Sequence, residues 1–403
     1  MKDRLGNHIQ QVRGVSYKPS DLSENLSDGY TVLLRANNIS EGRINFDSVQ
    51  FVRNNKISQE QILKTNDILV CSSSGSISLV GKSALYKKSG EHTFGAFCKV
   101  VRATGKLHPQ FIAFYMCSQA YRKHIEHIAN GANINNLRNE HLDEIQLDIP
   151  TDDQQKVIIS KLEKIQSIIT HRRTQLSKLD ELIKCRFVEM FGDPVDNPRG
   201  WETKGLLELG KCKNGMNFSA GESGVNVHCL GVGDFKDYSE ICNTSVLPKI
   251  SLNKMPPEEV MLQDGDIVFV RSNGNKMLVG RCLVIFPGDI PTTYSGFCIR
   301  FRKEAECVDT TYLVQLLKAD STRSKMAGRG ANIQNLNQQI LGALQIPIPP
   351  IELQQEFKDF IKQSDKFKFA YFLFTLITVL QKNYYILLEF FSICFFCFRF
   401  NSF

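Results

Sequence analysis

The sequence lacks the motifs that would make it an enzyme in its own right. It contains no G-x-S-x-G nucleophile motif, no matching glycine-rich cofactor turn after a strand, and no Asn- or Asp-Pro-Pro-aromatic motif of amino-methyltransferases. Its 8 histidines form no cluster with metal-ligand spacing. Any reaction in which this chain takes part would therefore have to be catalysed by partners.

The features of an exported protein and of a disulfide scaffold are also missing. The amino terminus, MKDRLGNHIQQVRG, carries charges and amides where a secretion signal needs an apolar stretch. The 12 cysteines are scattered, and only Cys394 and Cys397 have ligand-like spacing, in a Phe-rich stretch without a nearby histidine. We therefore expect a cytoplasmic protein with neither structural disulfides nor a zinc site.

Length and charge leave a two-domain, nucleic-acid-binding protein open. A chain of 403 residues exceeds what one hydrophobic core usually organises, so two domains are expected. Lysine and arginine total 49 against 42 aspartates and glutamates, which makes the net charge +7. This mild excess permits a nucleic-acid partner but does not by itself indicate one.

The chain contains an internal repeat. NDILVCSSSGSISLVGK over 66–82 aligns with GDIVFVRSNGNKMLVGR over 265–281, and GANINNL over 131–137 aligns with GANIQNL over 330–336. Both alignments have an offset of 199 residues, from 66 to 265 and from 131 to 330. Weaker matches surround them, including Phe-Cys at 97 and 297 and Gln-Gln at 154 and 354. The repeat predicts two copies of one domain.

Each copy combines strand and helix patterns. The β-branched, apolar runs at 68–71 and 267–270 have strand length, and each is followed by a polar turn with glycine. Segments 110–125 and 311–326 carry apolar residues at helical spacing. The pattern predicts an α+β protein built from two duplicated mixed α/β domains.

A long heptad run separates the copies. No proline or glycine interrupts residues 152–190, and a helix of that length would extend about 58 Å. A narrow apolar seam of this kind needs a partner helix, because a lone stripe would face water. The seam residues, which we predict to bind partners, are Ile158, Leu162, Ile165, Ile169, Leu176, Leu179 and Ile183.

The order of these motifs resembles the specificity subunits of Type I restriction-modification enzymes. In both copies a GANI-x-NL stretch is followed by a run ending in Ile-Pro and by a Gln-Gln pair that opens a long helix, and FGDP-x-x-NP-x-GW leads into the second copy. The resemblance covers residues 1 to about 363. It implies two target recognition domains, each of which reads half of a bipartite DNA site, in a chain without catalytic residues.

The resemblance also implies the partners, the cofactors and the domain order. The expected partners are double-stranded DNA, two modification subunits that carry S-adenosylmethionine and methylate adenine, and restriction subunits that use ATP and Mg, whereas this chain is expected to bind no cofactor or metal and no membrane. The predicted segments are target recognition domain 1 at 1–150, the central helix at 151–191, target recognition domain 2 at 192–350, the start of a second spacer helix at 351–363 and an aberrant Phe-rich tail at 364–403.

Three segments are candidates for DNA contact. The polar loops after 68–71 and 267–270 suit close approach to a backbone or groove, with solvent-exposed hairpin turns as the alternative. The segment after 32–34 differs strongly between the copies, as two readers of different sequences should, although surface drift gives the same appearance. The candidate DNA-binding residues are Arg35, Asn37, Asn38, Ser72, Ser73, Ser74, Gly75, Arg271, Ser272, Asn273, Gly274, Asn275 and Lys276.

The sequence departs from the family pattern near its end. Residues 364–403 show no heptad seam, so we expect that the second spacer helix is lost through a frameshift or recombination. The apolar run at 369–380 is short for a membrane span. Two other classes stay open: a scaffold that binds proteins rather than DNA, and a tail-anchored membrane protein.

Overall fold

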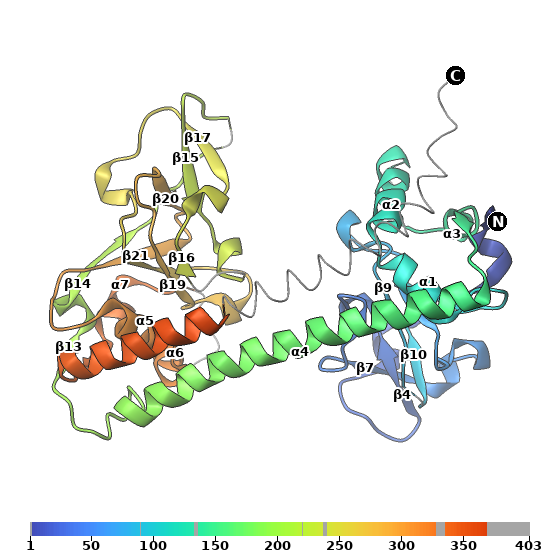
Figure 1. Cartoon of the computed structure of the whole chain (residues 1–403), viewed down its shortest axis with the longest axis horizontal. Coiled ribbons are helices and arrows are strands. Elements are labelled where there is room, and N and C mark those ends of the chain that lie inside the picture. Colours follow the sequence, from blue (N-terminus) through green and yellow to red (C-terminus); the bar gives the residue numbers. More distant parts are fainter. Residues whose placement is uncertain are drawn as a thin grey trace. The chain divides into compact units, whose positions relative to one another are not determined.

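The computed structural model divides the chain into two compact units, Met1–Ile169 and Thr170–Phe403, and the boundary falls inside one long helix. This helix, α4, runs without interruption over Asp152–Phe191, as the heptad pattern predicts (Figure 1). The structure describes residues 2–88, 90–132, 136–219, 221–236, 240–327 and 335–368.

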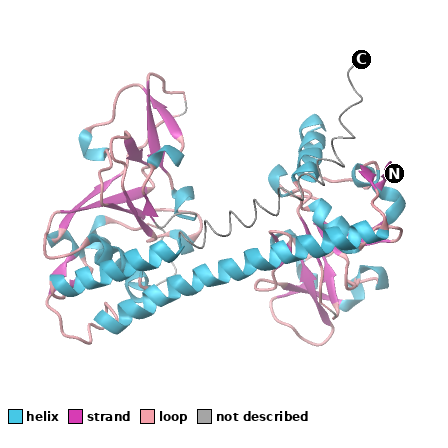
Figure 2. Ribbon diagram, in the orientation of Figure 1, coloured by secondary structure: helices cyan, strands magenta, loops and turns pink. Residues whose placement is uncertain are grey.

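The first unit contains two four-stranded sheets, with strand orders β10-β4-β7-β3 and β2-β11-β8-β9, and helices that cover the second of them (Figure 2). Two short strand pairs, β1-β12 and β5-β6, complete it. The strands are β1 Lys2–Arg4, β2 Ile9–Arg13, β3 Leu22–Ser23, β4 Tyr30–Leu34, β5 Ile39–Ser40, β6 Arg43–Ile44, β7 Gln50–Arg53, β8 Ile68–Cys71, β9 Ser83–Leu85, β10 His92–Phe94, β11 Cys98–Ala103 and β12 Gln146–Asp148, and the helices are α1 Pro109–Met116, α2 Gln119–Ala132 and α3 Glu140–Asp143.

Strand β8 explains why the run at 68–71 is apolar throughout. Successive side chains of a strand point to opposite faces of its sheet. Ile68 and Val70 join the core under α1 and α2, whereas Leu69 packs in the core shared with Leu34 and Phe94 of the other sheet. A strand that is buried on both faces has no polar positions, so its sequence does not alternate.

The second unit repeats this plan with a five-stranded sheet, β14-β21-β18-β19-β16, and a three-stranded sheet, β17-β15-β20. A short pair, β13-β22, corresponds to β1-β12. The strands are β13 Thr203–Gly205, β14 Gly210–Asn214, β15 Val225–Leu230, β16 Glu240–Ile241, β17 Lys249–Leu252, β18 Asp266–Val270, β19 Cys282–Ile285, β20 Thr292–Tyr294, β21 Cys298–Lys303 and β22 Gln345–Pro347, and the helices are α5 Thr310–Lys318, α6 Asp320–Ala327, α7 Gln338–Gly342 and a last helix described over 351–368.

The two copies are equivalent at the level of single residues. Ile267 and Phe269 of β18 face the core that contains α5, and Val268 and Val270 face the core of the three-stranded sheet, as the matching positions of β8 do. In both units a parallel pairing, β10 with β4 and β15 with β20, occurs at the same place. The predicted duplicated α+β fold is confirmed.

A buried ion pair accounts for the matching aspartates of the repeat. Arg102 donates from Nε to Oδ1 of Asp67 at 2.8 Å and from Nη2 to Oδ2 at 3.0 Å. Arg302 makes the same two bonds to Asp266, at 2.8 and 2.7 Å. Both aspartate side chains are almost fully buried, so these bidentate bonds join the central strand to its neighbour where water does not compete.

A buried glutamine attaches the start of α4 to the first unit. Gln155 is 1% exposed, and its Oε1 accepts a hydrogen bond from the backbone N–H of His108 at 2.9 Å. Its Nε2 donates to the carbonyl oxygens of Lys106 at 2.9 Å and Pro150 at 3.1 Å. All three partners of Gln155 are backbone groups, and one side chain of the domain also reaches the first turn, because His108 Nε2 lies 2.6 Å from Oδ1 of Asp152.

The second unit holds its last helix in the same way. Gln354 is fully buried and accepts from the backbone N–H of Asp309 at 2.7 Å. Its Nε2 donates to the carbonyl oxygens of Cys307 at 3.1 Å and Pro349 at 2.8 Å. The equivalent of Gln354 is therefore Gln155 at the offset of 199, which corrects the alignment of the two Gln-Gln pairs by one residue.

The last helix lies antiparallel to the end of α4 within the second unit (Figure 1). Phe357 is fully buried, and its ring centroid lies 5.5 Å from that of Phe187. The helix continues past Gln363 to Lys368, whose Nζ lies 2.8 Å from Oδ1 of Asp180. This corrects the expected start of an aberrant tail at residue 364, because the segment up to Lys368 is helical and packs against α4.

The predicted seam of α4 has different surroundings along its length. Ile183 is buried in the core of the second unit, and Ile158 packs against the core of the first. These two positions therefore belong to the domain cores rather than to a free surface. The seam residues between them, Leu162, Ile165, Ile169, Leu176 and Leu179, are half-buried.

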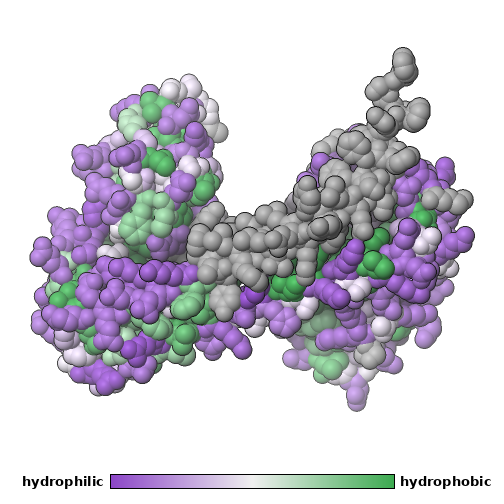
Figure 3. Space-filling view, viewed as in Figure 1, coloured by the Kyte–Doolittle hydropathy of each residue, from purple (hydrophilic) through white to green (hydrophobic). Residues whose placement is uncertain are grey.

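The predictions about the Phe-rich tail concern residues 369–403, which lie outside the described residues. In the part of the chain that the structure does describe, no helix combines the length and the hydropathy needed to cross a bilayer. On the face seen in Figure 3, hydrophilic side chains predominate over the described surfaces of both units, with apolar ones scattered among them.

Candidate nucleic-acid interface

In the first unit, the predicted DNA-contacting loop is bound to two other segments. The backbone N–H groups of Ser72 and Ser73 both donate to the carbonyl oxygen of Phe97, at 2.9 and 3.1 Å. The carbonyl oxygen of Ser72 accepts from Leu137 at 2.6 Å, and Ser73 forms a β-bridge with Asn136. The loop after β8, the turn before β11 and the segment that leads to α3 therefore meet at one place.

The second unit builds the same cluster. The N–H groups of Arg271 and Ser272 donate to the carbonyl oxygen of Phe297, at 2.8 and 3.3 Å. Leu336 donates to the carbonyl oxygen of Arg271 at 2.8 Å, and Ser272 forms a β-bridge with Asn335. Because backbone groups make all of these bonds, the side chains of the loop can differ between the copies without disturbing its position.

The loop interiors are shaped by short polar contacts. Asn273 accepts from the N–H of Asn275 at 2.7 Å, and Asn275 accepts from Met277 at 3.0 Å. In the first copy the Ser74 hydroxyl accepts from Ser76 at 3.2 Å. These turns keep the loop tips compact, and the tips themselves, Gly75 in one copy and Gly274 with Asn275 in the other, are exposed. The side chain of Lys276 lies outside the described residues.

In the segment after β4, the structure excludes one of the predicted DNA-contacting residues. Asn38 is 2% exposed, and its Oδ1 accepts from the N–H of Arg35 at 2.8 Å. Its Nδ2 donates to the carbonyl oxygens of Asn45 and Ser48, at 2.9 and 3.0 Å. The amide is fully used in closing a turn, so Asn38 is a structural residue and not a DNA contact. Asn37 is exposed.

The second copy makes the same turn with an acidic residue. Oδ2 of Asp234 accepts from the N–H of Gly231 at 2.8 Å, which is the bond that Asn38 makes to Arg35. The correspondence of these segments is therefore confirmed, and the change from Asn38 to Asp234 conserves a structural bond. The informative difference lies at Arg35, which the second copy replaces with Gly231.

Two exposed aromatic residues in the clusters were not among the predicted contacts. Phe97 is 65% exposed and Phe297 is 59% exposed, each next to the cysteine that begins β11 or β21. The sequence shows their match, but an apolar residue beside a strand is usually read as core. A glycine lies shortly before each phenylalanine, Gly95 in the first copy and Gly296 in the second. This glycine was the feature of the sequence that indicated a turn of the chain there.

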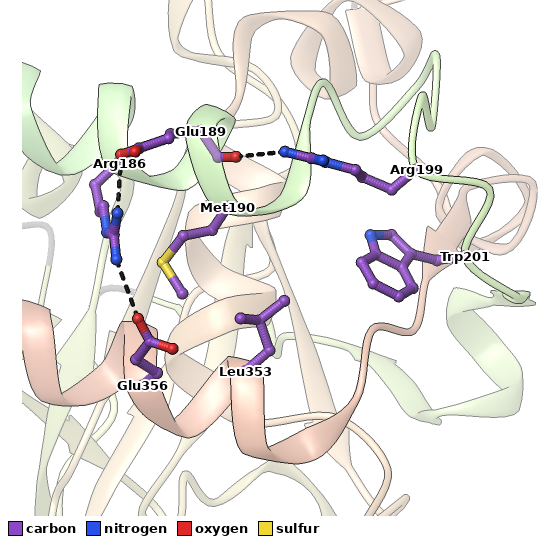
Figure 4. A pocket seen from close by; sticks show the side chains of 7 residues that line it. All are labelled: Arg186, Glu189, Met190, Arg199, Trp201, Leu353 and Glu356. Carbon is purple, nitrogen blue, oxygen red and sulfur yellow. Dashed lines mark hydrogen bonds and ion pairs between the residues drawn. The ribbon is translucent and has the colours of Figure 1, made fainter.

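A recess lies in the second unit, between the end of α4 and the last helix (Figure 4). The FGDP-x-x-NP-x-GW segment borders it, and Gly192, with φ of 80°, ends α4. The Asn197 side chain accepts a hydrogen bond from the backbone N–H of Trp201 and donates one to its carbonyl oxygen. Arg186 pairs with Glu189 of the same helix at 2.9 Å and with Glu356 of the last helix at 3.0 Å, so the second pair bridges the helices. The recess has a volume of about 380 Å³ and is lined by Arg186, Glu189, Met190, Arg199, Trp201, Leu353 and Glu356.

The site and the fold together define the class of protein: a duplicated binding protein that presents two polar loop clusters on equivalent scaffolds, with a long helix running from one unit into the other. Among the described residues no group of three or more His, Cys, Asp or Glu side chains is placed to hold a metal ion. The chain belongs to the family of the Type I restriction modification DNA specificity domain, whose sequence profile matches residues 16–180 and 198–372.

Curated relatives agree with this assignment. The chain is 30% identical over 365 residues to the Type I restriction enzyme StySPI specificity subunit of Salmonella potsdam. The aligned region covers 86% of this chain and 77% of the relative. It is 31% identical over 292 residues to the EcoKI specificity subunit of Escherichia coli strain K12, which covers 67% of this chain and 61% of that relative.

Solved structures support the fold. One similar chain comes from a structure that describes complex assembly and conformational transition of the type I R-M system. The match covers 95% of this chain and 95% of that chain. Its TM-score is 0.50 at 15% sequence identity, so the likeness concerns the fold alone. The duplicated sequence is thus a Type I restriction-modification specificity subunit in family and in architecture.

Proposed function

We propose that each loop cluster reads one half of a bipartite, double-stranded DNA site. The observation that carries this proposal is the identical backbone construction of the two clusters combined with different side chains at their tips. A scaffold that holds its loops through main-chain bonds can present Ser72 at one site and Arg271 at the other. Base identity is read by side chains, so such a pair suits two different half-sites.

The chemistry of the second cluster fits DNA. An arginine and two asparagines lie within a five-residue loop, and guanidinium and amide groups are the groups that pair with guanine and adenine edges in the major groove. A scaffold that binds only proteins would not need a basic, amide-rich loop on a rigid turn. The first loop, with four serines and a glycine over 72–76, would allow close approach to a phosphate backbone.

Partners would supply the chemistry in this proposal. Two modification subunits carrying S-adenosylmethionine would methylate adenine, and restriction subunits using ATP and Mg would cleave DNA, while this chain contributes recognition and assembly and binds no cofactor, in the cytoplasm. The names of the curated relatives, which are subunits of restriction enzymes, support a multi-subunit setting. The half-buried seam residues of α4 between Leu162 and Leu179 are the proposed docking positions for the modification subunits.

The proposed function is tested by exchanging one domain. Cells expressing the chain with its modification subunit are sequenced for methylated adenines, before and after residues 1–150 are replaced with the corresponding unit of a relative. We expect one half of the methylated motif to change and the other half to stay the same. A change of both halves together, or methylation that does not depend on this chain, would contradict the proposal.

Replacing Arg271 with alanine is expected to weaken DNA binding. A base contact would cost roughly 1–3 kcal/mol and relax specificity at one position, whereas a phosphate contact would lower affinity evenly and reduce the salt slope by about one. The measurement is a duplex titration at several salt concentrations. Lys211→Ala, which removes a positive charge from a side chain 76% exposed on β14, serves as the control. If wild type and Arg271→Ala bound DNA equally, the loop would be interpreted as a solvent-exposed turn that does not contact DNA.

A further inference from the structure

The two exposed phenylalanines occupy the same structural position. Phe97 and Phe297 each accept two backbone hydrogen bonds from the recognition loop, so the turn that carries the ring is part of the cluster. Single exposed apolar residues are common on protein surfaces and need no explanation. The duplicated exposure is different, because the surrounding loop positions have changed between the copies while the ring and its exposure, 65% and 59%, have stayed.

One arginine lies beside this turn in each unit, and it comes from a different loop in each. In the first unit a Cβ atom placed on Gly95 would lie 3.8 Å from Cγ of Arg35, which follows β4. In the second unit Nη1 of Arg271, which follows β18, donates to the carbonyl oxygen of Gly296 at 3.3 Å. The positions equivalent to these arginines are Gly231 and Ser72.

The combination of an exposed ring and an adjacent cation points to an anionic partner with apolar surfaces. Duplex DNA offers phosphates for the arginine and base faces for the ring. A protein partner would be expected to cover the ring in an apolar patch, but the loop residues that bond to the two phenylalanine carbonyls are serine and arginine, and the loop positions after them are serine, asparagine and glycine. Met277, 73% exposed just past the second loop, has Ser78 as its counterpart in the first.

We propose that Phe97 and Phe297 are the shared, sequence-independent base contacts of the two half-sites. Each ring lies against the bases, and an arginine from a variable position lies beside the turn that carries it. This inference rests on the proposed function and deepens it, because it separates affinity from specificity. Apolar side chains of proteins that bind in grooves contact or wedge between bases in this manner. The ring contributes to binding in both domains, whereas the variable loop residues determine which sequence is read.

The test uses the full chain with its modification subunit and a duplex containing the methylated motif. Phe97→Ala and Phe297→Ala are each expected to weaken binding roughly 5- to 30-fold, as loss of a contact residue does. The salt slope should stay at the wild-type value, because a phenyl ring releases no counterions. The methylated motif should keep its sequence while the extent of methylation falls. Phe97→Trp should restore most of the affinity.

Matched controls separate this result from a general loss of surface apolarity. Leu26 is 65% exposed, like Phe97, and Val246 is 56% exposed, like Phe297. Leu26→Ala and Val246→Ala should bind DNA as the wild type does. The thermal unfolding midpoint of every variant shows whether its domains are folded.

Several outcomes would overturn the inference. Wild-type affinity in both phenylalanine variants would do so while leaving DNA recognition intact, as would a fall in affinity accompanied by a smaller salt slope. Variants that keep DNA affinity but no longer co-purify with the modification subunit would show that the rings contact protein. If the wild-type complex itself does not bind duplex DNA in a salt-dependent manner, the proposed function fails together with the inference.

Discussion

Replacing Phe357 with alanine is expected to lower the unfolding free energy of the second unit by about 3–5 kcal/mol. The ring is fully buried and packs edge-on against Phe187 and Phe191, whose ring centroids lie 5.5 and 5.6 Å away. Its removal leaves a cavity between the last helix and the end of α4. Denaturant unfolding can be followed by the fluorescence of Trp201, the only tryptophan in the chain, which borders the recess between these helices.

The same helix supplies the control. Phe367 is 60% exposed, so Phe367→Ala removes an equal side chain from the same helix without opening a cavity. Its unfolding midpoint should stay close to that of the wild type. If Phe357→Ala and Phe367→Ala unfolded alike, the packing of the last helix against α4 would not contribute to the stability of the unit.

Asp266→Ala is expected to destabilise the second unit by about 3–5 kcal/mol, because it leaves a partly buried arginine without its carboxylate. The Asp266 side chain is 1% exposed and that of Arg302 is 25% exposed, so water compensates only in part. Arg300, at 7% exposure and 3.9 Å from the same carboxylate, would also lose this negative charge. Trp201 fluorescence during denaturant unfolding again reports the change.

A surface ion pair in the same unit provides the comparison. Lys211 and Glu304 approach to 2.8 Å with side chains 76% and 52% exposed. Exposed pairs contribute little to stability, so Glu304→Ala should leave the unfolding curve nearly unchanged. An Asp266→Ala protein as stable as Glu304→Ala would show that the buried pair is dispensable for the fold.

The architecture could be predicted because the repeat constrains it twice. Each strand or helix pattern had to suit two segments 199 residues apart, and a core strand such as β8 has a composition that few other elements share. The aspartates at 67 and 266 stood out in the alignment, although only the structure shows that they bind arginines. Partners distant in sequence cannot be inferred from one chain.

The candidate site was harder to predict for physical reasons. A polar residue in a loop can either contact a ligand or close a turn, and Asn38 does the second because its amide is buried. An aromatic residue beside a strand can lie in the core or on the surface, and Phe97 lies on the surface because the chain turns just before it. Both outcomes depend on the direction of the side chain, which residue type alone does not determine.

The segment that follows Gln363 was misjudged from composition. Residues 364–368 lack heptad spacing, yet Ser364 is 4% exposed and Lys368 pairs with Asp180. A helix that packs on a single neighbour at one end does not need a complete seam.

The buried glutamine at the start of each long helix has a consequence for how such proteins diversify. Gln155 and Gln354 bind only main-chain atoms of their domains, at equivalent positions in both. A domain with any surface sequence offers the same carbonyl and amide groups, provided that its backbone is conserved. The glutamine bonds therefore do not depend on the side chains of the recognition loops, and the other side-chain pairs at the two joints, His108 with Asp152 and Lys358 with Asp309, also lie outside those loops. The side chains of the recognition loops can therefore change while the attachment of each helix to its own domain is retained.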